Sequence, residues 1–382
     1  MSSHQRGQRT KGRLTLVILA LLSVVVMAAS VTIAVLLSKR QPPESTAPSS
    51  SQVVVGGFAC NAAEAARLHP FQGGVLKTDP SRISLLDMNG TEQWGVDCSM
   101  LVPTCFGTGE LMLVADIGGS SYYLVDREGI RKQGTVSGML TGASVAPSPD
   151  TRFALLIEQS GNKGLVRLVS ADTGREFEWD FISRKSGFVL SAAFSPAADR
   201  LDVVSMDTDG HNLQTMLKRL DTQTGAVLGQ FLPEAGEVST VVAYGVDDNP
   251  AVVGSKGITA FRPDATAAYR LQFHKVHQAV TTLQGLLVVA EKGPENPPAV
   301  FLIDADGGMQ EGPTLTGIPS SLAVSGRRVY IAVGAEVWSV GLEPFKLLGM
   351  TGAGAEIVRL GANGEDGCVA VTQEGVGRID IP

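Results

Sequence analysis

The fold is decided by residues 165–179, LVRLVSADTGREFEW, which read as two short strands joined by a tight turn. Residues that favour strands lie on both sides of the turn, and Gly174 supplies the positive φ angle that such turns need. The same order of strand, turn and strand occurs in six further stretches: residues 82–94, 121–134, 217–231, 257–273, 299–312 and 336–349. The sequence therefore predicts seven hairpins of one kind.

The hairpins recur at the period of a propeller blade. Their turn positions are 37 to 51 residues apart and fall at Gly90, Gly129, Gly174, Gly225, Ala265, Gly307 and Pro344. Pairs of inner strands, rich in small and apolar residues, precede the hairpins, for example in residues 142–158, 191–206 and 320–334. Four strands at about this spacing are typical of β-propellers. We therefore predict an all-β propeller of four-stranded blades over residues 53–382.

The two ends of this region are expected to meet. Residues 355–361, 367–373 and 376–382 read as three strands without a fourth, and an open last blade would expose an unpaired edge. The stretch QVVVGG (52–57) is the natural fourth strand. This gives eight blades, which we favour. Seven remains an alternative, because CNAAEAARL (60–68) reads as a short helix where an inner strand would belong.

Composition and charge agree with a chain of many short strands. The protein has 382 residues, 44 of them glycine, and only 18% are charged. Six of the 31 basic residues and none of the 38 acids lie in residues 1–40, so the remainder carries 25 bases and 38 acids, a net charge of −13. Such an acidic domain would repel a phosphate backbone, so we expect no nucleic-acid partner.

An apolar run near the N-terminus predicts one transmembrane helix. Residues 14–37 contain no charge for 24 positions, enough to cross a hydrocarbon core of about 30 Å. A cleaved signal peptide is the rival interpretation, with small residues at 28–30, but its apolar region usually has only about 7 to 15 residues. We favour the uncleaved anchor.

The charges around the span suggest its orientation. Four basic residues precede it and two follow it, and positive charge stays in the cytoplasm. We therefore expect residues 1–13 inside, the helix 14–37 in the cytoplasmic membrane, residues 38–52 as a Pro/Ser-rich linker, and the propeller outside. The reverse orientation, with a cytoplasmic propeller, stays open. A propeller closes its own edges, so a monomer is expected.

Four cysteines are present, at positions 60, 98, 105 and 368. In an exported domain they could form two disulfides, and Cys98 with Cys105 is the best pair because a short loop separates them. Four reduced thiols are the equal alternative, because a domain of this size needs no such links.

The order of these elements resembles a known family. Residues 68–94, 143–179 and 192–210, preceded by a basic N-terminus and one apolar span, look like uncharacterised single-pass membrane propellers of Gram-positive bacteria with quinoprotein-like or WD40-like repeats. The resemblance covers nearly the whole chain. It implies the fold and an extracytoplasmic location, and it transfers no catalytic residue.

The hairpin at 165–179 also resembles the docking repeat of quinone-dependent dehydrogenases. Asp172, Gly174 and Trp179 have the order of that repeat, and Asp87 and Trp94 form a partial second copy. In those enzymes the repeat locks neighbouring blades together, while other residues hold the cofactor. An adjacent-cysteine pair, common in them, does not occur here. We interpret these residues as structural and predict no cofactor.

Acidic turns and paired histidines are the other candidates for chemistry. MDTDGHN (206–212) and IDADGG (303–308) resemble the start of a calcium loop, but the later ligands are missing, so Asp207 and Asp209 are weak metal candidates and tight turns are the better interpretation. His274 and His277 in FHKVHQ (273–278) read as a solvated blade connection.

Two function hypotheses follow. The first is a membrane-anchored scaffold outside the cytoplasmic membrane that binds a protein or a cell-envelope polymer through its loops. The second is an exported enzyme, a lyase, hydrolase or quinone-dependent oxidoreductase, with its site at the channel. The sequence names no catalytic residue, and it does not say whether isolated acids such as Glu158, Asp202 and Glu291 converge.

Overall fold

A computed structural model describes residues 54–380, except 108, 162–163, 181–186, 209–212, 234–237, 247 and 364–366. The described residues form eight four-stranded antiparallel sheets and one short helix, α2 (Ala62–Ala65). The predicted all-β propeller is therefore confirmed, with eight blades. The predicted transmembrane segment 14–37 lies outside the described residues. Within residues 54–380, as far as they are described, no helix has the length and hydropathy needed to cross a bilayer.

Seven blades follow one another along the chain, each written here from its innermost to its outermost strand. Blade 1 has β2 (Leu68–Phe71), β3 (Gly74–Asp79), β4 (Arg82–Leu86) and β5 (Glu92–Asp97). Blade 2 has β6 (Pro103–Phe106), β7 (Met112–Asp116), β8 (Ser121–Val125) and β9 (Ile130–Thr135). Blade 3 has β10 (Met139–Val145), β11 (Arg152–Glu158), β12 (Leu165–Ser170) and β13 (Glu176–Asp180). Blade 4 has β14 (Phe188–Phe194), β15 (Arg200–Asp207), β16 (Gln214–Asp221) and β17 (Val227–Phe231).

The second half continues the pattern. Blade 5 has β18 (Ser239–Tyr244), β19 (Pro250–Gly254), β20 (Gly257–Phe261) and β21 (Ala267–Gln272). Blade 6 has β22 (Lys275–Thr282), β23 (Gly285–Glu291), β24 (Ala299–Ile303) and β25 (Met309–Thr314). Blade 7 has β26 (Ser321–Ser325), β27 (Arg328–Val333), β28 (Glu336–Leu342) and β29 (Phe345–Gly352).

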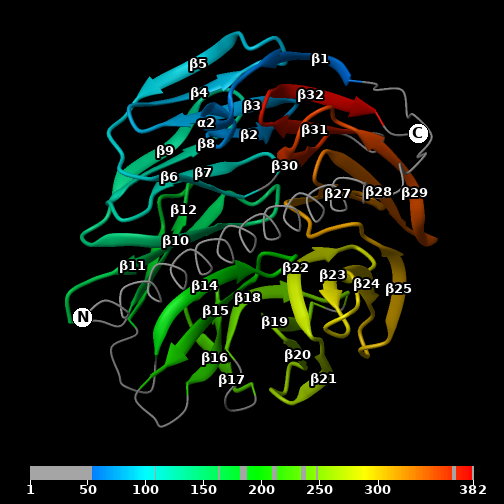
Figure 1. Cartoon of the computed structure of the whole chain (residues 1–382). Helices are drawn as coiled ribbons and strands as arrows, with labels where there is room; N and C mark the ends of the chain where they lie inside the picture. Colours follow the sequence, from blue (N-terminus) through cyan, green and yellow to red (C-terminus); the bar gives the residue numbers. More distant parts are fainter. Residues whose placement is uncertain are drawn as a thin grey trace, which may run out of the picture. The chain divides into compact units, whose positions relative to one another are not determined.

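Blade 8 closes the ring with strands from both ends of the domain. It contains β30 (Ile357–Ala362), β31 (Gly367–Thr372) and β32 (Gly375–Asp380), and its outermost strand is β1 (Val54–Ala59). Figure 1 shows β1 in blue beside β32 in red, and Phe58 pairs with Val376. Gly57 is required there, because a Cβ on it would lie 2.0 Å from the Val376 carbonyl oxygen. The predicted closure by the N-terminal strand is confirmed.

The structure of blade 1 shows why the propeller has eight blades and not seven. Residues 60–68 do contain the expected helix: Asn61 caps α2 by accepting a 3.0 Å hydrogen bond from the Glu64 N–H, and the Glu64 carboxylate accepts from Asn61 in return. The inner strand β2 then begins at Leu68, after Ala66 and Arg67, so blade 1 is complete. The helix adds to the inner strand and does not replace it.

Each predicted turn position joins the third and fourth strands of its blade. Five of them are glycines with positive φ, namely Gly90, Gly129, Gly174, Gly225 and Gly307. Ala265 has a φ angle of 69°, and Pro344 follows a cis peptide bond. Because the strands of a blade alternate in direction, these turns lie on the same edge as the turns between the first and second strands. This edge is called the turn face below, and the opposite one the connection face.

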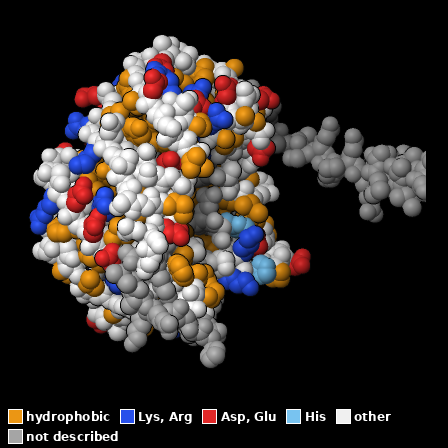
Figure 2. Space-filling view, turned by 90° about the vertical axis from the view of Figure 1, so that its left-hand side faces the viewer, with side chains coloured by type: hydrophobic (Ala, Val, Ile, Leu, Met, Phe, Trp, Pro, Cys, Tyr) orange, Lys and Arg blue, Asp and Glu red, His pale blue; other side chains and the backbone are white. Residues whose placement is uncertain are grey.

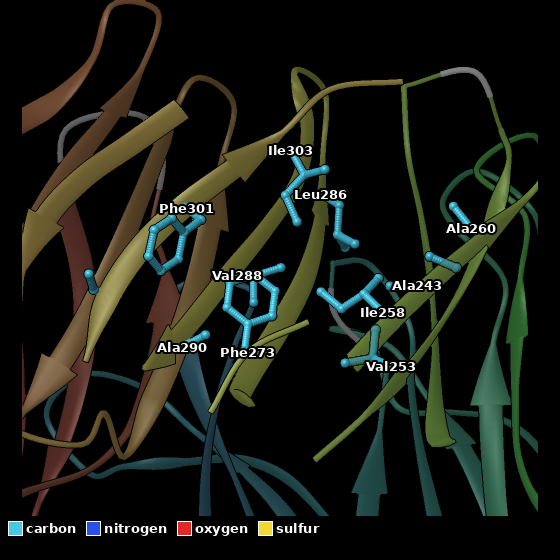
Figure 3. Close-up of a cluster of buried hydrophobic side chains, with 12 residues drawn as sticks. Ala243, Val253, Ile258, Ala260, Phe273, Leu286, Val288, Ala290, Phe301 and Ile303 are labelled. Carbon is cyan, nitrogen blue, oxygen red and sulfur yellow. The ribbon is translucent and has the colours of Figure 1, made fainter. Parts of the chain in front are cut away.

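Most of the core lies between neighbouring blades. Figure 3 shows the cluster between blades 5 and 6, where Ile258 and Val253 face Leu286 and Val288. The Phe273 and Phe301 rings in this cluster have centroids 5.6 Å apart. Neighbouring blades bury each other's apolar faces in this way round the ring. This packing fixes the inner strands, and hence every side chain that faces the channel.

Candidate functional site

The docking-repeat tryptophans reach the next blade. Trp94 Nε1 in β5 donates a 3.0 Å hydrogen bond to the Arg127 carbonyl oxygen in blade 2, and Trp179 Nε1 in β13 donates one of 2.8 Å to the Gly225 carbonyl oxygen in blade 4. Both acceptors lie in the outer turn of the following blade. These indoles thus link neighbouring blades at the periphery of the turn face, away from the channel.

The remaining residues of the repeat shape the turns themselves. Asp87 Oδ1 accepts hydrogen bonds of 2.8 Å and 2.9 Å from the N–H groups of Asn89 and Thr91. Gly174, with a φ angle of 69°, donates its N–H to the Ser170 carbonyl oxygen at 2.9 Å. The Asp172 side chain is exposed at this turn. Asp87 is therefore used as a turn-stabilising acceptor.

The calcium-like stretches have different surroundings. Asp304 Oδ1 accepts from the N–H groups of Asp306 and Gly308 at 3.0 Å and 2.7 Å, so IDADGG is a hydrogen-bonded hairpin turn. Asp207 is the last residue of β15 and pairs with Gln214, while Asp209 lies outside the described residues. No three potential metal-ligating side chains among the described residues come together to form a metal site.

Of the two alternatives for the cysteines, the structure has the reduced one: all four are free, and Cys98 is not bonded to Cys105. Cys98 follows the outermost strand of blade 1, and its Sγ lies 3.7 Å from the carbonyl oxygens of Asp79 and Pro80. Cys105 is in β6, the innermost strand of blade 2, and lines the channel. The two residues are close in sequence, but the chain between them crosses from the rim of one blade to the axis of the next.

A cavity of about 700 Å³ occupies the channel on the side of the turn face. The innermost strands of five blades line it: β2, β6, β22, β26 and β30. Most of its wall is apolar, with Phe71, Met112 and Leu322 among the lining residues. Its volume lies within the range of small-molecule pockets, about 300 to 1,000 Å³.

Arg359, His69 and Cys105 are among the polar side chains that line this cavity. Arg359 in β30 donates one hydrogen bond from Nη1 to the Leu68 carbonyl oxygen at 2.7 Å, and no carboxylate of the described residues forms an ion pair with it. His69 and Cys105 lie in the neighbouring strands β2 and β6. Burial lowers the pKa of the Arg359 guanidinium, although arginine remains protonated at neutral pH.

The neighbours of Arg359 are uncharged at neutral pH. Burial, and then the positive charge of Arg359, lower the pKa of His69 to about 3. Burial raises the pKa of the Cys105 thiol to about 12. The inner part of the cavity therefore holds one positive charge beside a neutral imidazole and a neutral thiol. At its outer end, Glu110 also lines the cavity, and its carboxylate accepts a 2.7 Å hydrogen bond from Ser148 Oγ.

A second cavity, of about 560 Å³, lies on the connection-face side of the channel and shares Val280 and Leu322 with the first. His277 lines it, and its Nε2 lies 2.7 Å from Glu291 Oε1. The interpretation of FHKVHQ as a solvated connection is thus wrong for its second histidine. His277 is part of the innermost strand β22, because the blade begins two residues earlier, at Lys275.

The isolated acids do not converge. Asp202 is fully buried and accepts hydrogen bonds from Arg219 Nε and Nη2 at 3.0 Å and 2.9 Å. The Tyr244 hydroxyl lies 2.9 Å from Asp202 Oδ2 and links blade 5 to this pair in blade 4. Glu158 ends β11 with an exposed side chain, and Glu291 contacts His277. The three acids therefore have separate surroundings.

Two further cavities continue outward from the channel on the turn face. One, of about 470 Å³, shares Gln72 and Glu110 with the channel cavity and extends to blade 3. The next, of about 330 Å³, shares residues 149–151 with it and reaches the outer turn of blade 4. We call these three adjoining cavities the trough. Charged residues of both signs line it, among them Arg127, Asp150 and Arg175.

Charges of both signs are also mixed over the side of the molecule in Figure 2, where acidic and basic side chains alternate with apolar ones.

Arg359 and His69 belong to no motif that the sequence analysis recognised. The only available signal for Arg359 was a charge inside an apolar inner strand, between Val358 and Leu360. That signal does not predict the hydrogen-bond partner of Arg359, because this partner, the Leu68 carbonyl oxygen, is 291 positions away in the sequence.

Comparison with protein families gives one match. The model of a family of unknown function, DUF5711, matches residues 48–285, more than half of the chain. No curated protein matches the chain in sequence.

Solved structures resemble it at low identity. Sqt1 of Saccharomyces cerevisiae has a TM-score of 0.60 at 10% identity, covering 86% of this chain and 100% of that one. BamB of Moraxella catarrhalis has a TM-score of 0.51 at 12% identity, with 86% and 100% covered, and the computationally designed Ika8 has 0.55 at 12%, with 87% and 98% covered. At such identities the likeness shows the fold alone.

Proposed function

We propose that this chain, which belongs to the DUF5711 family of unknown function, is a membrane-anchored binding module. Its propeller would lie outside the cytoplasmic membrane and hold an extended ligand, either a protein segment or a cell-envelope polymer. The apolar run 14–37, the basic residues before it and the Pro/Ser-rich linker support the anchor and the orientation.

The observation that carries the binding role is the trough. Its three cavities adjoin one another from the channel, over blades 2 and 3, to the outer turn of blade 4. A line of adjoining depressions suits a chain-like ligand better than a compact one. The wall supplies both charges and an apolar surface, including the Phe177 ring under the Arg175 guanidinium, 4.6 Å from the ring centroid. Rigid blades hold these turn residues in place, as binding loops require.

Proximity labelling of the full-length chain in native membranes tests this role. Arg127 and Arg175 both line the trough and have exposed side chains, so Arg127→Glu with Arg175→Glu should change the ligand surface without changing the core. The matched control is Arg327→Glu with Lys346→Glu, two exposed positions in blade 7 outside the trough.

We expect the wild type and the control to label the same neighbours, and the trough variant to lose them. Identical labelling by all three proteins would contradict binding in the trough. Labelling of cytoplasmic neighbours alone would contradict the proposed orientation. Impermeant thiol labelling of Cys98 on intact cells gives an independent measure of that orientation.

An enzyme with its site at the channel is the second candidate, and the His277–Glu291 pair favours it. An imidazole held by a carboxylate at 2.7 Å in a cavity wall is the arrangement of a general base. Hydrolysis of an activated ester such as p-nitrophenyl acetate by the wild type, and its loss in His277→Gln, would support this function. Equal rates for the two proteins would contradict it.

A further inference from the structure

The inner end of the channel cavity has a charge without a counter-charge. Arg359 uses one of its five N–H donors on the Leu68 carbonyl oxygen and makes no other hydrogen bond with a described residue. A half-buried guanidinium without a carboxylate partner is unusual, because burial of an unpaired charge is costly. The remaining donors therefore favour an external anion.

No carboxylate among the described residues forms an ion pair with Arg359. The neighbouring side chains at this end of the cavity are His69 and Cys105, and the acid Glu110 lies at the outer end, where its carboxylate accepts from Ser148 Oγ. His69 makes no hydrogen bond with another described residue, so its ring can donate to or accept from a ligand. Among the described residues, the Arg359 guanidinium has no ion-pair partner and the His69 imidazole has no hydrogen bond, and both face the same space within a domain whose overall charge is negative.

The rest of the wall determines the shape of the ligand. Phe71, Met112 and Leu322 line a space of about 700 Å³ around the polar end. A ligand that fits must pair a small anionic group with an apolar body. The planar guanidinium fork matches a carboxylate, which it can hold through two parallel hydrogen bonds.

We infer that the channel cavity binds the carboxylate of an amphipathic ligand, with Arg359 as the anion-binding residue, His69 as a second hydrogen-bonding group and the apolar wall around the ligand body. This inference rests on the proposed binding role and names the chemistry of one end of the trough. The carboxylate comes either from a small organic acid or from the C-terminal residue of a peptide that lies along the trough.

Calorimetric titration of the purified full-length chain in nanodiscs, with empty nanodiscs subtracted, tests the inference. The probes are hexanoate, its neutral analogue hexanol, and N-acetyl-leucyl-leucine with either a free or an amidated C-terminus. We expect binding of hexanoate or of the free dipeptide, and none of the alcohol or the amide. Hexanoate alone would indicate a small acid, and the dipeptide alone a peptide terminus.

Arg359→Gln should weaken carboxylate binding at least about tenfold, the order that one charge-assisted pair contributes. Arg327→Gln removes the same charge from an exposed turn outside the cavity and should leave the affinity unchanged. If Arg359→Gln does not fold, Val280→Phe serves instead, because it narrows the cavity and keeps the arginine; it too should weaken binding.

The inference is overturned if the wild type binds neither carboxylate, if the neutral analogues bind equally well, or if both cavity variants bind like the wild type. These outcomes are distinct from failure of the proposed function. If labelled neighbours are lost only in the Arg127→Glu, Arg175→Glu variant, ligand binding in the trough is supported even when no carboxylate binds in the channel. If a carboxylate binds but no neighbour is labelled, only the carboxylate site in the channel cavity is supported.

Discussion

Trp179 in blade 3 donates its indole N–H to the carbonyl oxygen of Gly225 in blade 4, at 2.8 Å. The Phe177 ring also packs on Gly225, and a Cβ on this glycine would lie 2.7 Å from the ring. Similar contacts recur at other blade boundaries, where Phe58 covers Gly90 and Tyr269 covers Gly307. An aromatic residue of one outer strand thus packs on the turn glycine of the next blade.

Truncation of this indole should destabilise the propeller. Because part of the Trp179 ring is exposed, we expect Trp179→Ala to lower the free energy of unfolding by about 2 kcal/mol, less than the roughly 3 to 5 kcal/mol of a fully buried ring. Trp179→Phe keeps a ring and loses the hydrogen bond, and should cost about 1 kcal/mol. Denaturant unfolding of the full-length chain measures both. Wild-type stability in the alanine variant would show that the contact does not hold the blades.

Closure of the ring depends on Gly57. A Cβ there would lie 2.0 Å from the Val376 carbonyl oxygen, whereas a Cβ on Gly56 would have no neighbour within 4 Å. Both residues have positive φ, so both alanine variants carry backbone strain of about 1 kcal/mol. We expect Gly57→Ala to lower the melting temperature more than Gly56→Ala and to increase proteolysis near the N-terminal strand. Equal effects of the two variants would argue against tight pairing of β1 with β32.

The buried Asp202–Arg219 pair should be sensitive to loss of one partner. Asp202→Asn leaves the buried Arg219 guanidinium without its counter-charge, at an expected cost of about 3 to 5 kcal/mol. Tyr244→Phe keeps the ion pair and removes the hydroxyl contacts with Asp202 Oδ2 at 2.9 Å and the Ala193 carbonyl oxygen at 3.0 Å, and should cost about 1 kcal/mol. Chemical denaturation compares the two variants. A cost for Asp202→Asn no greater than that for Tyr244→Phe would contradict a tightly paired interior.

The His69 imidazole should make the protein less stable in acid. Its pKa is about 3 in the folded protein, against an ordinary 6.5, because of burial and then the charge of Arg359. Below pH 6.5 the unfolded chain therefore binds a proton at His69 that the folded chain does not. The contribution of neutral His69 to the free energy of unfolding is fully present above pH 6.5 and is lost as the pH falls toward 3.

Unfolding free energies measured at several pH values test this linkage. The free energy of unfolding of His69→Gln should decline less than that of the wild type between pH 6.5 and 3. His274→Gln, at an exposed histidine, is the control and should follow the wild-type curve. Parallel curves for all three proteins would contradict the burial of His69 as a neutral group.

The four thiols should differ in reactivity. Burial raises the pKa of Cys105 and of Cys368 to about 12, and both should react slowly with a thiol reagent at pH 8 in the folded protein. Cys60 and Cys98 have pKa values that burial raises by less, so they should react first. Alkylation followed by mass spectrometry gives the order. A disulfide-linked peptide containing Cys98 and Cys105 would contradict the free thiols of the structure.

Much of the propeller was predictable because its determinants are local. Such hairpin turns favour a residue that tolerates positive φ, and five of the seven turn positions are glycines with positive φ, which can be recognised within a few residues of sequence. Strand closure was also predictable, since three C-terminal strands needed a fourth. The sequence left a Cys98–Cys105 disulfide and four reduced thiols as equal alternatives, because sequence proximity does not say which strand of a blade each cysteine joins.

The sequence by itself therefore determined the blade period, the turn residues and the pairing of the first and last strands of the propeller, since each follows from short-range backbone preferences and the need to cover an edge. The tertiary structure alone decided what faces the channel. Arg359 donates a hydrogen bond to the carbonyl oxygen of Leu68, which lies 291 positions earlier in the sequence. The two residues meet, next to His69, only because ring closure makes β30 and β2 neighbours. Which inner-strand side chains share a cavity depends on the packing of all eight blades, and no local pattern records it.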